Sequence, residues 1–141
     1  MKRSMKTLIV GVSVAAAVPL LATATAQAAP PGSVYFNYGG KNCAITPDGV
    51  IGCDGWQMVT AVTLPVGGGL PIDVPAPQSI QDATGIHPSY DFSQPYTLPG
   101  GNPDFESVAN DQGPWGPRLS FAGAFCEISF HGWFRCVPRG A

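Results

Sequence analysis

The chain has 141 residues, of which 11% carry charge, with 7 Lys and Arg against 9 Asp and Glu. Its length fits one small domain. Three of the basic residues precede residue 28, so residues 29–141 hold four cations against nine acids, a net charge of −5. An acidic chain with so few cations lacks the basic surface of a nucleic-acid binder, and we expect no nucleic-acid partner.

Residues 1–28 have the layout of a secretion signal. Three basic residues precede the apolar stretch "TLIVGVSVAAAVPLLATA", which leads into the small-residue sequence "AQA" at 26–28. A transmembrane anchor is the alternative, but Pro19 interrupts the apolar run. We therefore predict Sec-type export with cleavage after Ala28, no membrane span after signal removal, and a single small β domain of residues 29–141, located extracellularly or in the cell envelope.

All four cysteines lie in an eleven-residue motif that occurs twice, "CAITPDGVIGC" at 43–53 and "CEISFHGWFRC" at 126–136. An even count in a small exported domain predicts disulfides, and four cysteines allow three pairings. The upstream sequences "YGGKNC" and "FAGAFC" extend the likeness into an internal repeat of residues 38–53 and 121–136. We predict two related β-hairpin lobes. Chance similarity between segments rich in Gly and Cys is the alternative.

The first copy contains the turn sequence "TPDGV". Pro47 presets φ for the first turn position, and Gly49 supplies the positive φ that ends a three-residue hairpin loop. With Asp48 at the centre, the strands place Cys43 directly opposite Cys53 at a non-hydrogen-bonded site. There the Cα atoms are about 4.5 Å apart, within reach of a disulfide.

The second copy supports the same register about His131, with Gly132 at the positive-φ position and Cys126 opposite Cys136. Because both copies agree, we predict local pairing in each hairpin, and pairing between the copies is the alternative. Each disulfide would close an eleven-residue ring and stabilise the fold by about 2–3 kcal/mol.

Side-chain alternation divides each hairpin into two faces. In both copies, the cysteines share a face with large apolar residues, and we expect these faces to form the core. The opposite face of the second hairpin carries Glu127, Ser129, Trp133 and Arg135. Glu127 lies opposite Arg135, so we expect a cross-strand charge pair worth at most about 1 kcal/mol on a polar face.

Further strands are predicted at 33–38, 58–64 and 118–121, which are rich in β-branched and aromatic residues. Residues 65–117 show no sustained period, and their prolines and glycines argue against long regular elements. We predict an irregular, mostly ordered loop draped over the hairpins, with one helical turn capped by Asn102. The predicted fold class is all-β, a small disulfide-stabilised domain of two related hairpin lobes with a long Pro/Gly-rich loop.

Two segments carry a family resemblance. "YFNYGGKNCAITPDGVIGCD" resembles the "F-x-[ST]-P-[SD]-G-x-I-x-C" opening of small exported actinobacterial proteins of uncharacterised function, and "LSFAGAFCEISFHGWFRC" resembles their later "G-x-x-C…G-[VL]-x-C" segment. The two patches cover about a third of residues 29–141. A further cysteine pair and a Gly-His-Gly-Phe tail, expected in such proteins, are missing here. The resemblance implies export and a β architecture, and it brings no catalytic residues to this chain.

The sequence contains little that indicates a catalytic site. His87 and His131 are the two histidines, and no G-x-S-x-G elbow accompanies them. The C-x9-C spacing is not that of a zinc finger. We therefore expect no enzyme, no cofactor and no metal site. A small hydrolase is the least favoured alternative, and it would require a histidine within hydrogen-bond reach of a serine or carboxylate in a cleft.

The candidate binding residues are Phe130, His131 and Trp133 at the second hairpin tip. Exposed aromatic residues on a rigid tip are typical binding anchors. The alternative, which we favour, is that Trp133 packs beneath the 65–117 loop. The leading hypothesis is a non-catalytic exported protein that binds a protein or cell-envelope component or has a structural role. The second hypothesis is an inhibitor or effector of a secreted enzyme that acts through residues 65–117.

Overall fold

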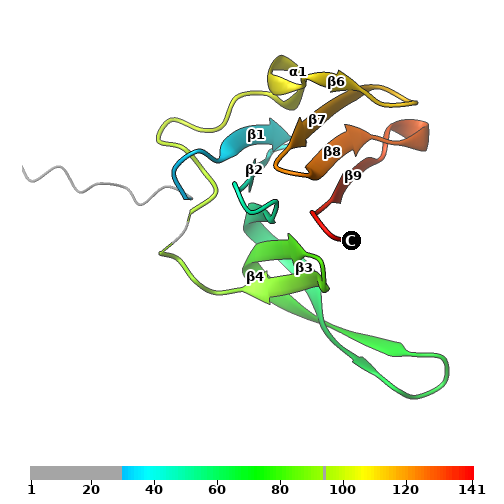
Figure 1. Ribbon diagram of the computed structural model, residues 1–141. Coiled ribbons are helices and arrows are strands. Elements are labelled where there is room, and N and C mark those ends of the chain that lie inside the picture. Colours follow the sequence, from blue (N-terminus) through cyan, green and yellow to red (C-terminus); the bar gives the residue numbers. More distant parts are fainter. Residues whose placement is uncertain (1–29, 94) are drawn as a thin grey trace, which may run out of the picture.

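The computed structural model describes residues 30–93 and 95–141, which form two antiparallel sheets (Figure 1). The predicted secretion signal lies outside these residues. Within the described part of the chain, no helix is long and apolar enough to cross a membrane. The first sheet has the strand order β1-β2-β3-β4-β5, with bounds Val34–Tyr38, Lys41–Ile45, Ile51–Leu64, Leu70–Asp82 and Gly85–Ser89. The second has the order β6-β7-β8-β9, with bounds Asp111–Gln112, Pro117–Phe121, Ala124–Ile128 and Phe134–Val137.

The predicted all-β class, the two hairpins and both local disulfides are confirmed. Ile45 pairs with Ile51 in the first hairpin, as the turn centred on Asp48 requires, and Ile128 pairs with Phe134 in the second. Cys43–Cys53 and Cys126–Cys136 are bonded, each with its Cα atoms 4.0 Å apart. The predicted turn glycines also have positive φ, 75° at Gly49 and 76° at Gly132.

The internal repeat is one strand longer than the sequence indicated. β1, β2 and β3 form a three-stranded meander, and β7, β8 and β9 form a second with the same pairings. Tyr38 pairs with Lys41 across the first turn, and Phe121 pairs with Ala124 across the equivalent second turn. The upstream strands share few residue types, VYFNY in β1 and PRLSF in β7, so the sequence comparison did not include them in the repeat.

One hydrophobic core joins the two meanders. The predicted core faces meet there, and both disulfides lie in or against this core. Phe134 of β9 is central, because its ring contacts the rings of Phe36, Tyr38 and Phe105 at centroid distances of 4.1 to 5.9 Å. Phe105 belongs to α1 (Phe105–Val108), a single helical turn whose one buried residue fills the core beside β1.

The prediction that residues 65–117 form one irregular loop is wrong for residues 70–89, which form β4 and β5. Prolines were the misleading signal. Pro71, Pro75 and Pro77 all lie in β4. β5 pairs only with Gln78–Asp82, so the proline-containing part of β4 has a neighbouring strand on one side only, and proline is tolerated in such an edge position.

The predicted helical turn exists, but its N-cap is Asp104, whose carboxylate accepts a hydrogen bond from the Glu106 N–H at 3.1 Å. Asn102 has a different role. Its side-chain amide donates to the carbonyl oxygens of Phe36, Cys43 and Tyr96 at 2.8 to 3.1 Å. It thereby ties the 95–104 segment to the first sheet, a long-range role that a local capping pattern does not reveal.

Candidate functional site

Trp133 is exposed at the tip of the β8–β9 hairpin. Its side chain is 77% exposed, and Phe130 is 53% exposed. The interpretation we favoured from the sequence, that Trp133 packs beneath the 65–117 loop, is therefore wrong. The physical reason is that Tyr96, from residues 65–117, packs against Ala44 of the other lobe.

The structure brings a fourth aromatic residue to the tip. Trp115 is 58% exposed, and its ring centroid lies 4.8 Å from that of Phe130 in an edge-on contact. The Phe130 ring in turn lies 3.8 Å from the His131 ring. We call Trp115, Phe130, His131 and Trp133 the aromatic cluster. Sequence reasoning missed Trp115 because it is 18 residues away from Trp133, although its setting in "GPWGP" marks a turn.

Two glycines let the turn that carries Trp115 approach β8. The turn is closed by a hydrogen bond from the Gly113 N–H to the Gly116 carbonyl oxygen at 2.8 Å. A Cβ atom on Gly113 would lie 2.6 Å from Oε2 of Glu127, and one on Gly116 would lie 3.2 Å from Cβ of Ile128. A side chain at position 113 would therefore displace the Glu127 carboxylate, and one at position 116 would crowd Ile128.

The hairpin tip itself is an unusual short 3-10 turn, Phe130–Gly132. His131 has φ 61°, a left-handed conformation that is uncommon for a residue with a side chain. The Tyr38 hydroxyl donates a hydrogen bond to the Gly132 carbonyl oxygen at 3.2 Å, which ties the tip to the first lobe. The aromatic cluster thus stands on a tip that is fixed by a disulfide, by the core residue Phe134 and by Tyr38.

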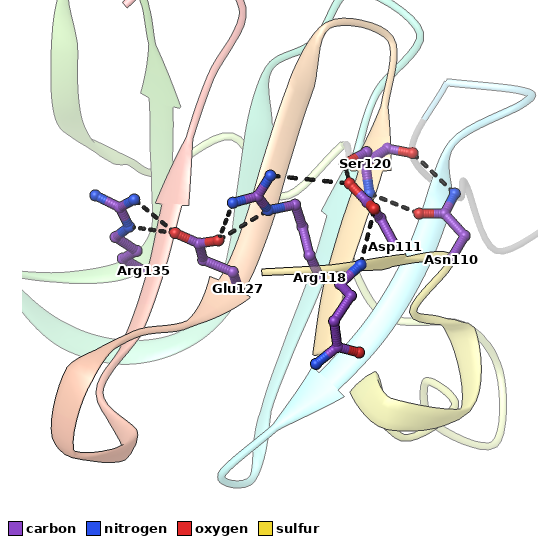
Figure 2. A network of polar contacts seen from close by, with 7 residues as sticks. Asn110, Asp111, Arg118, Ser120, Glu127 and Arg135 are labelled. Carbon is purple, nitrogen blue, oxygen red and sulfur yellow. Dashed lines mark hydrogen bonds and ion pairs between the residues drawn. The ribbon is translucent and has the colours of Figure 1, made fainter. Parts of the chain in front are cut away.

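Beneath the aromatic cluster lies a buried carboxylate, shown in Figure 2. Glu127 is only 1% exposed. Arg118 donates through Nε and Nη2 to Oε2 at 2.8 and 2.5 Å, and Arg135 donates in the same way to Oε1. The sequence predicted the Arg135 pair but placed it on a polar face. Arg118 from β7 and the Gly113 turn are what bury the carboxylate.

The two arginines determine the ionisation of Glu127. Burial alone would raise the pKa of Glu127, but the hydrogen bonds and positive charges of Arg118 and Arg135 outweigh burial and hold the pKa below its usual range. The carboxylate therefore stays ionised at neutral pH. Both guanidinium groups also lie over the Phe125 ring, 4.8 and 5.8 Å from its centroid, which orients their planar forks toward the carboxylate.

The network extends to the edge strand β6. Asp111 lies 3.8 Å from the Arg118 guanidinium, and Asn110 exchanges two hydrogen bonds of 2.9 Å with the backbone of Ser120 (Figure 2). These contacts hold β6 against β7, and the turn that carries Trp115 connects the same two strands. The buried ion pairs therefore support the position of Trp115 as well as that of the hairpin.

The histidines do not form a catalytic relay in the part of the chain that the structure describes. His87 lies in β5, and its Nε2 atom contacts both the Thr84 hydroxyl at 2.8 Å and the Asp82 carboxylate at 3.2 Å. A nucleophile–histidine–carboxylate relay uses the two different ring nitrogens. Hydrogen bonds from Thr84, with help from His87, lower the pKa of Asp82 to about 2, as expected for a turn-stabilising carboxylate. His131 belongs to the aromatic cluster.

A second exposed surface is the distal part of the β3–β4 hairpin, residues 55–75, which we call the arm. Figure 1 shows it projecting away from the body. Successive pairs place six aliphatic side chains on one face, because Leu70, Ile72 and Val74 alternate along β4 and pair with Leu64, Val62 and Val59. Val62, Leu70 and Ile72 are exposed, whereas Val59 is buried. A register shift between Thr60 and Val62 keeps this face in phase. The opposite face holds the hydrogen-bonded pair Thr60 and Asp73.

Comparison with models of protein families, with curated proteins and with solved structures found no match. The function is therefore inferred from the aromatic cluster, the arm and the chemistry around them.

Proposed function

We propose that the protein is a non-catalytic exported binding protein of the extracellular space or cell envelope, and that the aromatic cluster contacts a macromolecular partner. The observation that carries this proposal is the exposure of two tryptophans and a phenylalanine on a rigid support. Trp, Tyr and Arg dominate the energetics of protein interfaces, and single exposed aromatic residues lose little side-chain entropy on binding when they are already fixed.

Export is part of the proposal. Both disulfides would persist in an oxidising compartment, and the basic, apolar and small-residue segments of residues 1–28 are typical of a cleaved signal. The resemblance to small exported actinobacterial proteins supports the same location. N-terminal sequencing of the secreted product tests it, and we expect Ala29 as the first residue.

The partner is tested by affinity capture from cell-wall fractions and from secreted proteins, with purified protein as bait. Trp115→Ala and Trp133→Ala should each weaken capture of the same partner tenfold or more, as for other interface anchors. Trp56→Ala is the matched control, because Trp56 is 74% exposed but lies on the arm. Equal loss in all three variants, or in none, would contradict a role for the aromatic cluster.

The second candidate is an inhibitor or effector of a secreted enzyme that acts through the 65–117 segment. The observation that favours it is the exposed aliphatic face of the arm, which includes residues 70–74 of that segment. Val62→Asp places a charge on this face, and Thr63→Asp places the same charge on the opposite face. Loss of inhibition of a co-secreted hydrolase in the first variant alone would support this candidate, and equal inhibition by both would count against it.

A further inference from the structure

A cavity of about 620 Å³ lies between the inner side of the first sheet and β9. This volume is within the range of about 300–1,000 Å³ that is typical of small-molecule sites. Its walls come from both lobes, since Ile51 and Val59 of β3 face it from one side and Phe134 and Cys136 of β9 from the other. The cavity is therefore a product of how the two meanders meet.

The walls suit an apolar ligand body. Phe134 and Tyr38 stack with their ring centroids 4.1 Å apart, and both line the cavity. Ile51 and Val59 are buried aliphatic residues of the facing wall. An aromatic or aliphatic group placed here would exchange water for contact with these side chains, which is favourable in proportion to the apolar area that is covered.

The polar groups of the cavity favour a negative charge. The described residues that line it include two cations, Lys41 and Arg135, and no acid. Gln57 and Gln81, which also line it, already use their amide nitrogens, Gln57 toward the Ser79 hydroxyl at 2.8 Å and Gln81 toward the Cys136 carbonyl oxygen at 2.9 Å. These hydrogen bonds hold the two amide groups in place, and neither partner carries a negative charge that would neutralise the cations of the cavity.

Lys41 is the cation that a ligand would use. Arg135 already donates to the carboxylate of Glu127, a residue that does not line the cavity. The Lys41 ammonium group donates to Gln57 Oε1 at 3.1 Å, and no carboxylate forms an ion pair with it in the described residues. Its contact with Gln57 holds it at the cavity, where it can make a charge-assisted hydrogen bond to an acidic group.

We propose that this cavity binds a small amphipathic anion, a molecule with an apolar body and one carboxylate or sulfonate-like group, whose acidic group contacts Lys41. The body lies against Phe134, Tyr38 and Val59. The site is separate from the aromatic cluster. Ligand binding in the cavity therefore does not depend on whether that cluster binds a macromolecule.

Two fluorescent probes test the proposal with the purified protein and both disulfides intact. Anilinonaphthalene sulfonate has an apolar body and one negative charge, and phenylnaphthylamine has a similar body without the charge. We expect the sulfonate to bind at one site per chain and more tightly than the neutral probe. Lys41→Gln should weaken sulfonate binding about tenfold and leave the neutral probe nearly unchanged.

Arg139→Gln is the matched control, because Arg139 also lacks an ion-pair partner in the described residues but does not line the cavity. Ser79→Phe fills the cavity and should abolish binding of both probes. Ile86→Trp, at an exposed position of the same wall, serves if that variant fails to fold. Several weak sites per chain, equal loss in the Lys41 and Arg139 variants, or unchanged binding in the filled variant would overturn the proposal.

Discussion

Replacing Glu127 by Gln tests whether the buried carboxylate organises the second lobe. The substituted amide would keep the shape of the side chain but lose its charge and one acceptor oxygen. One arginine would then face an amide N–H₂ group and lose its two hydrogen bonds. Hydrogen bonds to charged groups are worth about 1.5–3 kcal/mol each, and water replaces them in part because both arginines are partly exposed. We therefore expect a loss of about 2–4 kcal/mol in the free energy of unfolding.

The loss should depend on pH in one direction. Because the pKa of Glu127 is lower in the folded state than its ordinary value of 4.5, ionised Glu127 stabilises the fold fully above that value. The contribution is lost as the pH falls through the lowered folded pKa. Urea denaturation of both proteins from about pH 7 to about pH 3 should show the stability difference shrinking only at the acidic end.

Glu106→Gln is the control, because Glu106 is an exposed acid of α1 outside the network. Its effect should stay within about 0.5 kcal/mol. The reasoning is refuted if Glu127→Gln costs no more than this control, or if the difference between wild type and Glu127→Gln stays constant across the acidic range.

Three further outcomes follow from the fold. Replacing Cys43 and Cys53 together by serine should lower stability by about 2–3 kcal/mol in chemical denaturation, and non-reducing peptide mapping that links the two lobes would contradict the pairing. Gly52→Ala should destabilise because its Cβ atom would overlap the Tyr96 ring, and a Tyr96→Ala background should relieve much of that cost in a double-mutant cycle. Trp133→Ala should change the free energy of unfolding by less than about 0.5 kcal/mol, since a loss of several kcal/mol would place that side chain in the core.

The aromatic cluster shows which contacts a local sequence pattern can predict and which it cannot. Phe130, His131 and Trp133 are neighbours in sequence, so a hairpin register was enough to place them at one tip. Trp115 joins them through the Gly113 turn, which packs closely against the buried Glu127 carboxylate. No local pattern predicts that contact, because it requires the β6–β7 and β8–β9 connections to meet at the same end of the second sheet.

The repeated eleven-residue motif by itself determined the hairpin register and the disulfide pairing, since the conformation of a turn glycine and the alternation of side chains along a strand depend only on nearby residues. Tertiary structure decided what covers each copy. At equivalent positions the first lobe has Ala44 and Gly52, which the Tyr96 ring covers, and the second has Glu127 and Arg135, which Arg118 completes. A small pair leaves room for a ring, whereas a buried carboxylate requires a second cation. Whether the Tyr96 ring or the Arg118 guanidinium covers a given hairpin depends on the path of the chain between the two copies. The burial of residues far apart in the sequence determines that path.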